Sequence, residues 1–80
     1  MWVFMSDDPK TLDATGLLCP LPVLKARKRL QALQTGETLT VIADDPAAIV
    51  DVPHFCSESG HVLVSSDLNG ATQTYIIRKS

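Results

Sequence analysis

The sequence predicts an α/β (α+β) two-layer sandwich, ordered β-α-β-α-β-β, in which two helices cover one face of a four-stranded mixed sheet. Two segments carry apolar residues at helical spacing, and four others have the alternation or composition of strands. The last two strands flank an Asn-Gly pair, which favours a tight hairpin turn. Because β-α-β connections are right-handed, both helices should lie on the same side of the sheet.

The first strand is expected over Lys10–Ala14, with Leu12 and Ala14 pointing to one side. Gly16 then supplies a flexible turn before the first helix. Pro20 suits the first helical position, because the N–H that proline lacks would have no partner there.

Apolar residues at helical spacing predict the buried stripe of this first helix, and Thr35-Gly36 ends it. With that stripe against the sheet, Lys25, Lys28 and Arg29 should point mostly toward water. The stripe consists of Val23, Ala26, Leu30 and Leu33.

The next segment, Glu37–Ala43, has the pattern of a largely buried strand. Asp45 and Pro46 are then expected as the N-cap and first residue of a second helix, which Pro53 should bend or split. The buried side of this helix should carry Ile49, Val52 and Cys56. After Gly60, the runs HVLVSSDL and ATQTYIIRK predict two strands around a turn at Asn69-Gly70.

Eighty residues give one domain, near the lower size limit for a core without disulfides or a metal. We assign residues 1–9 to a flexible N-terminus, in which Met1–Phe4 is an extension or a misassigned start, and residues 10–80 to the single domain. The longest apolar run, Met1–Met5, is too short for a membrane span or a signal peptide, so we expect a cytoplasmic protein without membrane contact.

The formal net charge of -2 argues against a nucleic-acid binder, which normally needs a basic face. Tyr75 is the only aromatic residue in the last two predicted strands, so the sheet lacks the stacking platform that binds RNA. Positive charge is nevertheless concentrated at one place, which predicts one basic patch. It consists of Lys25, Arg27, Lys28 and Arg29.

The segment GLLCPLP, Gly16 to Pro22, places a thiol where a loop enters a helix. With Cys19 at the N-cap, its sulfur would face the positive end of the helix dipole, which favours the nucleophilic thiolate. Pro20 and Pro22 remove two of the four N–H donors of the first turn, and the dipole contributes about 0.3 to 1 kcal/mol, so the thiol pKa should fall by less than about one unit. Such a mildly activated thiol suits a carrier that must accept a group and then release it.

A structural role for Cys19 stays open on this pattern alone, because free cysteine is among the most often buried residue types. Cys19 and Cys56 are both expected as thiols in a reducing compartment, with Cys56 in the core. Together with His54 and His61 they match no common zinc spacing, so no metal site is expected. His54 should lie on the surface and His61 at the start of a strand.

The stretches LDATGLLCPLPVLKARKRLQAL and GETLTVIADDPAAIVDVPHFCSESGH, with a final hairpin ending in YIIRK, strongly resemble the TusA/SirA family of sulfur carriers. The likeness covers about Leu12 to Lys79. It implies the two-layer sandwich, similar to the C-terminal domain of bacterial translation initiation factor three. Carried onto this sequence, it implies Cys19 as the persulfide acceptor, Pro20 and Pro22 as the prolines of the C-P-x-P motif, and Gly16 at the turn.

The resemblance also implies partners. In this family the motif cysteine takes sulfur from a cysteine desulfurase and relays it to an acceptor protein, in the best-known branch toward 2-thiouridine in tRNA. Other branches serve sulfur oxidation or molybdenum-cofactor assembly. No cofactor is expected in this chain, because the pyridoxal phosphate of the desulfurase supplies the sulfur chemistry. A non-catalytic regulatory module remains an alternative, and it would tolerate Cys19→Ser.

Docking on these partners is expected to involve Lys25, Arg27 and Lys28, because they share a helix with Cys19. Asp45 is first a helix cap and second a possible partner contact. We expect a monomer with no direct contact to nucleic acid.

Overall fold

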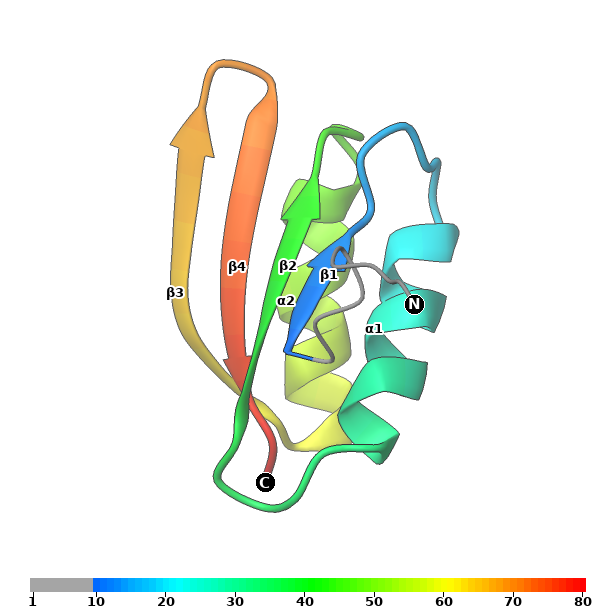
Figure 1. Ribbon diagram of the computed structural model, residues 1–80. Helices are drawn as coiled ribbons and strands as arrows, with labels where there is room; N and C mark the ends of the chain where they lie inside the picture. The colour runs from blue at the N-terminus through cyan, green and yellow to red at the C-terminus, as the bar shows by residue number, and fades with distance from the viewer. Residues whose placement is uncertain (1–9) are drawn as a thin grey trace, which may run out of the picture.

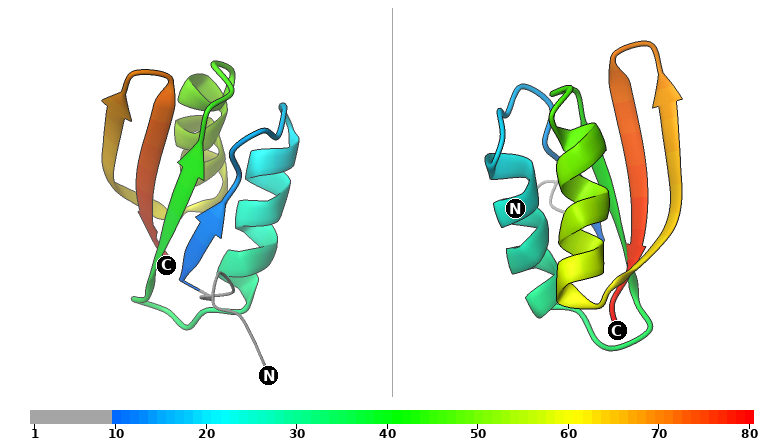
Figure 2. Two further views of the ribbon diagram at one scale, coloured as in Figure 1. Left: turned by 45° about the horizontal axis from the view of Figure 1, so that its top comes forward. Right: turned by 180° about the vertical axis from the view of Figure 1, so that it is seen from behind.

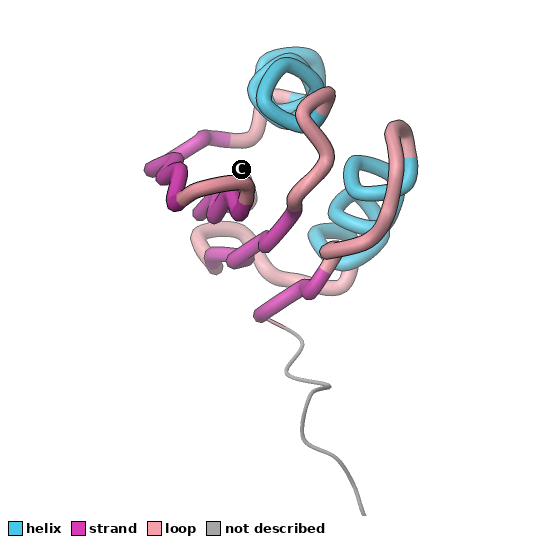
Figure 3. The backbone as a smooth tube through the Cα atoms, turned by 90° about the horizontal axis from the view of Figure 1, so that it is seen from above, coloured by secondary structure: helices cyan, strands magenta, loops and turns pink. Residues whose placement is uncertain are grey.

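The computed structural model describes residues 10–80, and the predicted flexible N-terminus, residues 1–9 with Met1–Phe4, lies outside the described residues. Six elements follow in the predicted order, and both helices cover one face of the sheet (Figure 1, Figure 3). The two-layer sandwich predicted from the sequence is therefore confirmed. The elements are β1 (Thr11–Asp13), α1 (Leu21–Gln31), β2 (Thr38–Ala43), α2 (Ala48–Ser59), β3 (Val62–Asn69) and β4 (Thr72–Arg78).

The four strands form one mixed sheet in the order β1-β2-β4-β3. β1 is parallel to β2, whereas β4 pairs antiparallel with both β2 and β3. A parallel pair needs a crossover, and α1 provides it between β1 and β2. The loops that follow β1 and β2 consequently lie together at the end of the molecule where the two helices begin (Figure 2).

The core lies between the sheet and the helices. Leu39, Val41 and Ala43 of β2 are fully buried, as the alternation in this strand predicted. Leu12 and Ala14 face the same layer, and Val23 packs against it half-buried. The helices and β4 complete the core with Ala26, Leu30, Ala48, Val52, Phe55, Cys56, Tyr75 and Ile77.

The first helix begins one residue later than the sequence predicted. Pro20 is the N-cap and not the first helical residue, because its carbonyl accepts the first helical hydrogen bond, from the Leu24 N–H at 3.0 Å. The exposure expected for Arg29 is also wrong. Its Nη1 donates to the Thr11 carbonyl at 3.0 Å, so the side chain lies half-buried along the edge strand β1.

The second helix corrects three expectations. Its N-cap is Ala47 and not Asp45, and the helix runs without interruption through Pro53. Ile49 is 48% exposed, although the stripe was expected to bury it. The buried residues of this helix are Ala48, Val52, Phe55 and Cys56. They are four, three and one positions apart, so the buried stripe passes beside Ile49.

The β3–β4 hairpin forms as predicted, with its turn one residue further on. Asn69 pairs with Thr72, so the loop consists of Gly70 and Ala71. Gly70 has φ 63°, the left-handed conformation that glycine adopts most easily. Neither helix found in residues 10–80 has the length and apolar character needed to cross a membrane.

Candidate functional site: the Cys19 loop

The loop between β1 and α1 consists of two consecutive turns. In the first, the Leu17 N–H donates to the Ala14 carbonyl at 3.2 Å, and Gly16 has φ 80°. A Cβ at Gly16 would meet no atom within 4 Å, so the backbone conformation rather than space requires glycine there. In the second turn the Leu21 N–H donates to the Leu18 carbonyl at 2.9 Å, which places Cys19 at an exposed corner. The Cys19–Pro20 peptide bond is cis.

Two consecutive aspartates of the β2–α2 loop hold the Cys19 loop in place. The Gly16 N–H donates to Asp44 Oδ1 at 2.9 Å, and the Cys19 N–H donates to Asp45 Oδ2 at 2.6 Å. Asp45 Oδ1 also accepts the Ala47 N–H at 3.2 Å. Hydrogen bonds to a carboxylate are about twice as strong as neutral ones, so these bonds tie the two loops together. Asp45 thus uses one carboxylate oxygen for the turn that follows it and the other for Cys19.

The thiol of Cys19 donates to Asp51 Oδ2, and Asp51 lies in the first turn of α2. The pKa of Cys19 is raised, first by this hydrogen bond, then by desolvation, and then by the charges of Asp51 and Asp45. The expected mild activation by the helix dipole is therefore wrong. Two carboxylates favour the neutral thiol, and the Leu21 N–H of the first turn is bonded to the Leu18 carbonyl and not to the sulfur.

A groove of about 320 Å³ runs beside the thiol between the two helices. The guanidinium carbon of Arg27 lies 5.8 Å from the centre of the Phe55 ring, a cation–π contact at the wall of this groove. The remaining lining residues supply both charges and apolar surface: Cys19, Pro20, Val23, Asp51, His54 and Glu58.

The basic cluster of α1 is divided between two faces of the helix. Arg27 lines the groove of the thiol, whereas Lys25 and Lys28 line a separate hollow of about 360 Å³ with Arg29. The structure thus brings Arg27 and Asp45 to the Cys19 site, and it places Lys25 and Lys28 elsewhere on α1.

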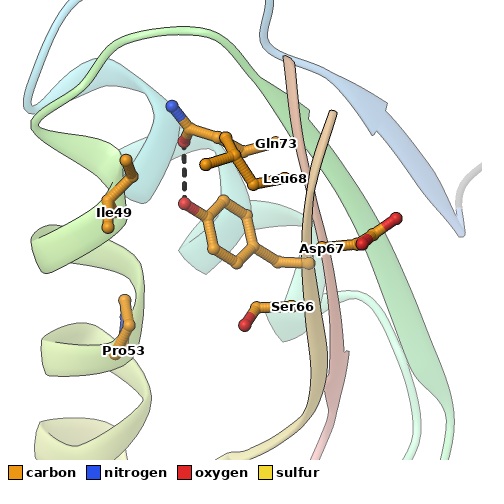
Figure 4. A pocket seen from close by; sticks show the side chains of 7 residues that line it. Ile49, Pro53, Ser66, Asp67, Leu68 and Gln73 are labelled. Carbon is orange, nitrogen blue, oxygen red and sulfur yellow. Dashed lines mark hydrogen bonds between the residues drawn. The ribbon is translucent and has the colours of Figure 1, made fainter. Parts of the chain in front are cut away.

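Gln73, which the sequence did not single out, connects the core to the β2–α2 loop that holds the Cys19 loop in place. It is 3% exposed and is the only buried amide side chain in the part of the chain that the structure describes. Its Nε2 donates to the Asp45 carbonyl at 3.0 Å, and its Oε1 accepts the Tyr75 hydroxyl at 2.7 Å. Figure 4 shows the latter bond at the pocket between α2 and the β3–β4 hairpin. All buried polar side-chain atoms of the described residues have partners.

The remaining cysteine and the two histidines have different surroundings. Cys56 is buried as predicted, which raises the pKa of its thiol, and both cysteines are free. His54 is exposed and lines the groove, while His61 precedes β3 and accepts the Ser80 N–H at Nδ1, 3.2 Å away. Across residues 10–80, no three His, Cys, Asp or Glu side chains are grouped so as to hold a metal ion.

Asp51 is the second residue that sequence reasoning missed. It is 32 positions from Cys19, and no local pattern links the two. An acidic residue in the first turn of a helix is common, because it interacts favourably with the helix dipole. For this reason no sequence pattern indicated that Asp51 contacts the thiol.

Fold and site together define a small two-layer domain that presents one exposed thiol among carboxylates. Residues 10–79 match the family model described as sulfurtransferase TusA, and the chain belongs to this family. The crystal structure of a SirA-like protein from Desulfitobacterium hafniense is similar, with a TM-score of 0.75 and 26% sequence identity over 85% of this chain and 93% of that one. The resemblance to the TusA/SirA family is thus confirmed, and with it a role in sulfur transfer.

Proposed function

We propose that this chain carries a transferable sulfur atom as a persulfide on Cys19. The single observation that supports this most is the position of Cys19 in a member of the sulfurtransferase TusA family: exposed, at a fixed corner, beside a groove. Cys56 is too buried to meet the cysteine of a partner protein. An exposed thiol on a rigid loop loses little conformational freedom when it docks.

The donor in this proposal is a cysteine desulfurase, and the receiver is a downstream acceptor protein. In the first transfer the Cys19 sulfur bonds to the terminal sulfur of the donor persulfide, and the donor leaves as a thiol. In the second transfer a thiol of the acceptor takes that sulfur and Cys19 returns to its starting state. No electrons are gained or lost overall, so this chain needs no cofactor of its own.

We assign the relay to the cytoplasm, where thiols stay reduced, and to the branch that leads to 2-thiouridine in tRNA. The chain itself acts as a monomer and does not bind the RNA. Arg27 at the groove, with Lys25 and Lys28 on another face of α1, steers acidic partner surfaces toward the thiol. Asp45 contributes to docking by fixing the loop that carries Cys19.

Intact-mass analysis after incubation with a cysteine desulfurase and cysteine tests the proposal. We expect a gain of one or more sulfur atoms that a reductant removes, present in Cys56→Ser and absent in Cys19→Ser. Sulfur that stays on Cys19→Ser and disappears from Cys56→Ser would refute the assignment. Full function of Cys19→Ser in a cell that depends on this chain would instead favour the regulatory module.

The route is tested separately, because the same persulfide serves a relay toward sulfur oxidation or molybdenum-cofactor assembly. Deletion of the gene for this chain should lower 2-thiouridine in the tRNA of its host, as measured by mass spectrometry of nucleosides. Unchanged 2-thiouridine together with loss of a molybdenum enzyme or of sulfur oxidation would move the chain to those branches.

A further inference from the structure

The thiol of Cys19 is hydrogen-bonded to the carboxylate of Asp51. The carboxylate of Asp51 accepts the thiol hydrogen, and it comes from α2, whereas the thiol comes from the loop before α1. Sulfur transfer needs a nucleophilic thiolate, yet the charges of Asp51 and Asp45 disfavour that thiolate. The Asp51 carboxylate therefore does not keep Cys19 in the thiolate form before sulfur transfer begins.

We propose that Asp51 is a catalytic residue that receives the Cys19 proton during sulfur loading, passes it to the departing donor sulfur, and protonates the Cys19 sulfur when sulfur is delivered. The inference rests on the proposed function of Cys19. The geometry it uses is the hydrogen bond from Sγ to Oδ2, made inside the groove where a donor persulfide must approach. Proton transfer by a positioned side chain requires contact of this kind.

As the Cys19 sulfur forms a bond to the terminal sulfur of a donor R–S–S–H, the S–S bond of the donor breaks. The Cys19 proton moves to Asp51 and then to the departing R–S⁻, which leaves as R–S–H. Cys19–S–S–H results, and no oxidant or reductant is consumed. Delivery to an acceptor thiol is the reverse, with Asp51 protonating the Cys19 sulfur as it leaves.

The proton has to move while the S–S bond forms and not before it. The pKa of a free thiol lies about four to five units above that of a free carboxyl group, so prior transfer would give very little thiolate. Once the sulfur shares its electron pair with a second sulfur, it no longer holds the proton, and the carboxylate at hydrogen-bond distance takes it. An adjacent base activates a nucleophile in this way in other covalent mechanisms.

Other ionisable groups near the thiol have different positions. Asp45 accepts the main-chain N–H of Cys19 and not its thiol. Arg27 from α1, and His54 and Glu58 from α2, line the groove without a hydrogen bond to the sulfur among those that the structure shows for residues 10–80. Asp51 is the group to which the thiol points.

The test compares the full-length chain with Asp51→Asn, Asp51→Glu and the control Asp67→Asn. Asp67 is an exposed carboxylate on β3, so its substitution makes the same chemical change away from the thiol. Two rates are measured from pH 6 to 9: alkylation of Cys19 by iodoacetamide, which reports the thiolate, and sulfur loading from glutathione persulfide, followed by intact mass. A small donor removes partner docking from the measurement.

For Asp51→Asn we expect faster alkylation than in the parent, and sulfur loading slower by about tenfold or more at pH 6.5. The deficit should shrink as the pH rises, because the thiolate then forms without help. Asp51→Glu should recover part of the loading rate, and Asp67→Asn should match the parent.

Faster alkylation together with equal or faster loading in Asp51→Asn would overturn the proposal, since the carboxylate would then only hold the thiol neutral. Loading of Asp51→Glu no better than that of a folded Asp51→Asn would also count against it. These outcomes differ from failure of the proposed function itself, in which the parent would accept no sulfur from the desulfurase.

Discussion

The main-chain N–H of Cys19 donates to the carboxylate of Asp45 at 2.6 Å, which joins the loop of the thiol to the start of α2. We predict that Asp45→Ala lowers the free energy of unfolding by about 1 to 2 kcal/mol, because charged hydrogen bonds are lost at the join. Hydrogen exchange of the Cys19 amide should accelerate. The Ala14 amide, bonded to the Ile42 carbonyl at 2.7 Å, is the internal control. Unchanged protection of Cys19 would mean that the loop holds its shape without Asp45.

Gln73 and Tyr75 should act as a coupled pair in a double-mutant cycle. Gln73→Leu leaves the buried Tyr75 hydroxyl without its partner and removes one of the two hydrogen bonds that the Asp45 carbonyl accepts, the other coming from the Ala48 N–H at 2.9 Å. We therefore expect a loss of about 1 to 3 kcal/mol in the free energy of unfolding, measured in urea. Tyr75→Phe removes only one of these bonds and should be milder. The double variant should be less destabilised than the sum of the two. Simple additivity would argue against a connected network.

Arg27→Glu should slow sulfur acceptance from a cysteine desulfurase more than Lys28→Glu does, because Arg27 lines the thiol groove. We expect a loss of about tenfold for Arg27→Glu that diminishes as salt rises. The double variant of Lys25 and Lys28 to Glu should slow transfer to a smaller degree. Loading from glutathione persulfide, which needs no docking, is the control and should change little. Equal effects of Arg27→Glu and Lys28→Glu would show that the groove has no special part in docking.

Cys56→Ala should lower stability by about 1 kcal/mol, because it removes one buried sulfur atom from the core. Sulfur transfer by Cys19 should continue at the parent rate. The two measurements are urea unfolding and persulfide loading of the same preparation. A folded variant that no longer accepts sulfur would show that Cys56 takes part in the chemistry.

His61 should make the protein less stable in mild acid. Desolvation, and then the charge of Lys79, lower its pKa from the ordinary value of 6.5, and Nδ1 accepts the Ser80 N–H only when unprotonated. The unfolded chain therefore binds the proton more readily. The contribution of unprotonated His61 to the free energy of unfolding should be complete above pH 6.5 and should decline as the pH falls below that value. Urea midpoints at pH 8 and 5.5 should differ more in the parent than in His61→Gln. If the midpoints of the parent and of His61→Gln differ by the same amount between the two pH values, the pH dependence comes from groups other than His61.

Most helices and strands of this protein can be predicted from local patterns in its sequence. The alternation in β2 and the helical spacing around Ala26 and Leu30 name core residues correctly, because each pattern has one way to bury its apolar side. Gly16 and Pro20 likewise mark where the loop of Cys19 turns and where α1 starts, within one residue. The sequence by itself thus determined the two-layer fold and the place of an exposed thiol at the start of a helix.

Tertiary structure decided what surrounds that thiol. Asp45 reads as a helix cap, but its carboxylate accepts an N–H from a residue 26 positions earlier, and Asp51 meets the sulfur across 32 positions. These contacts reverse the expected direction of the Cys19 pKa shift, since the hydrogen bond to Asp51, desolvation and the carboxylate charges all favour the neutral thiol. Local spacing cannot reveal them, because they arise only when the parallel pairing of β1 and β2 brings both following loops to one end of the sheet.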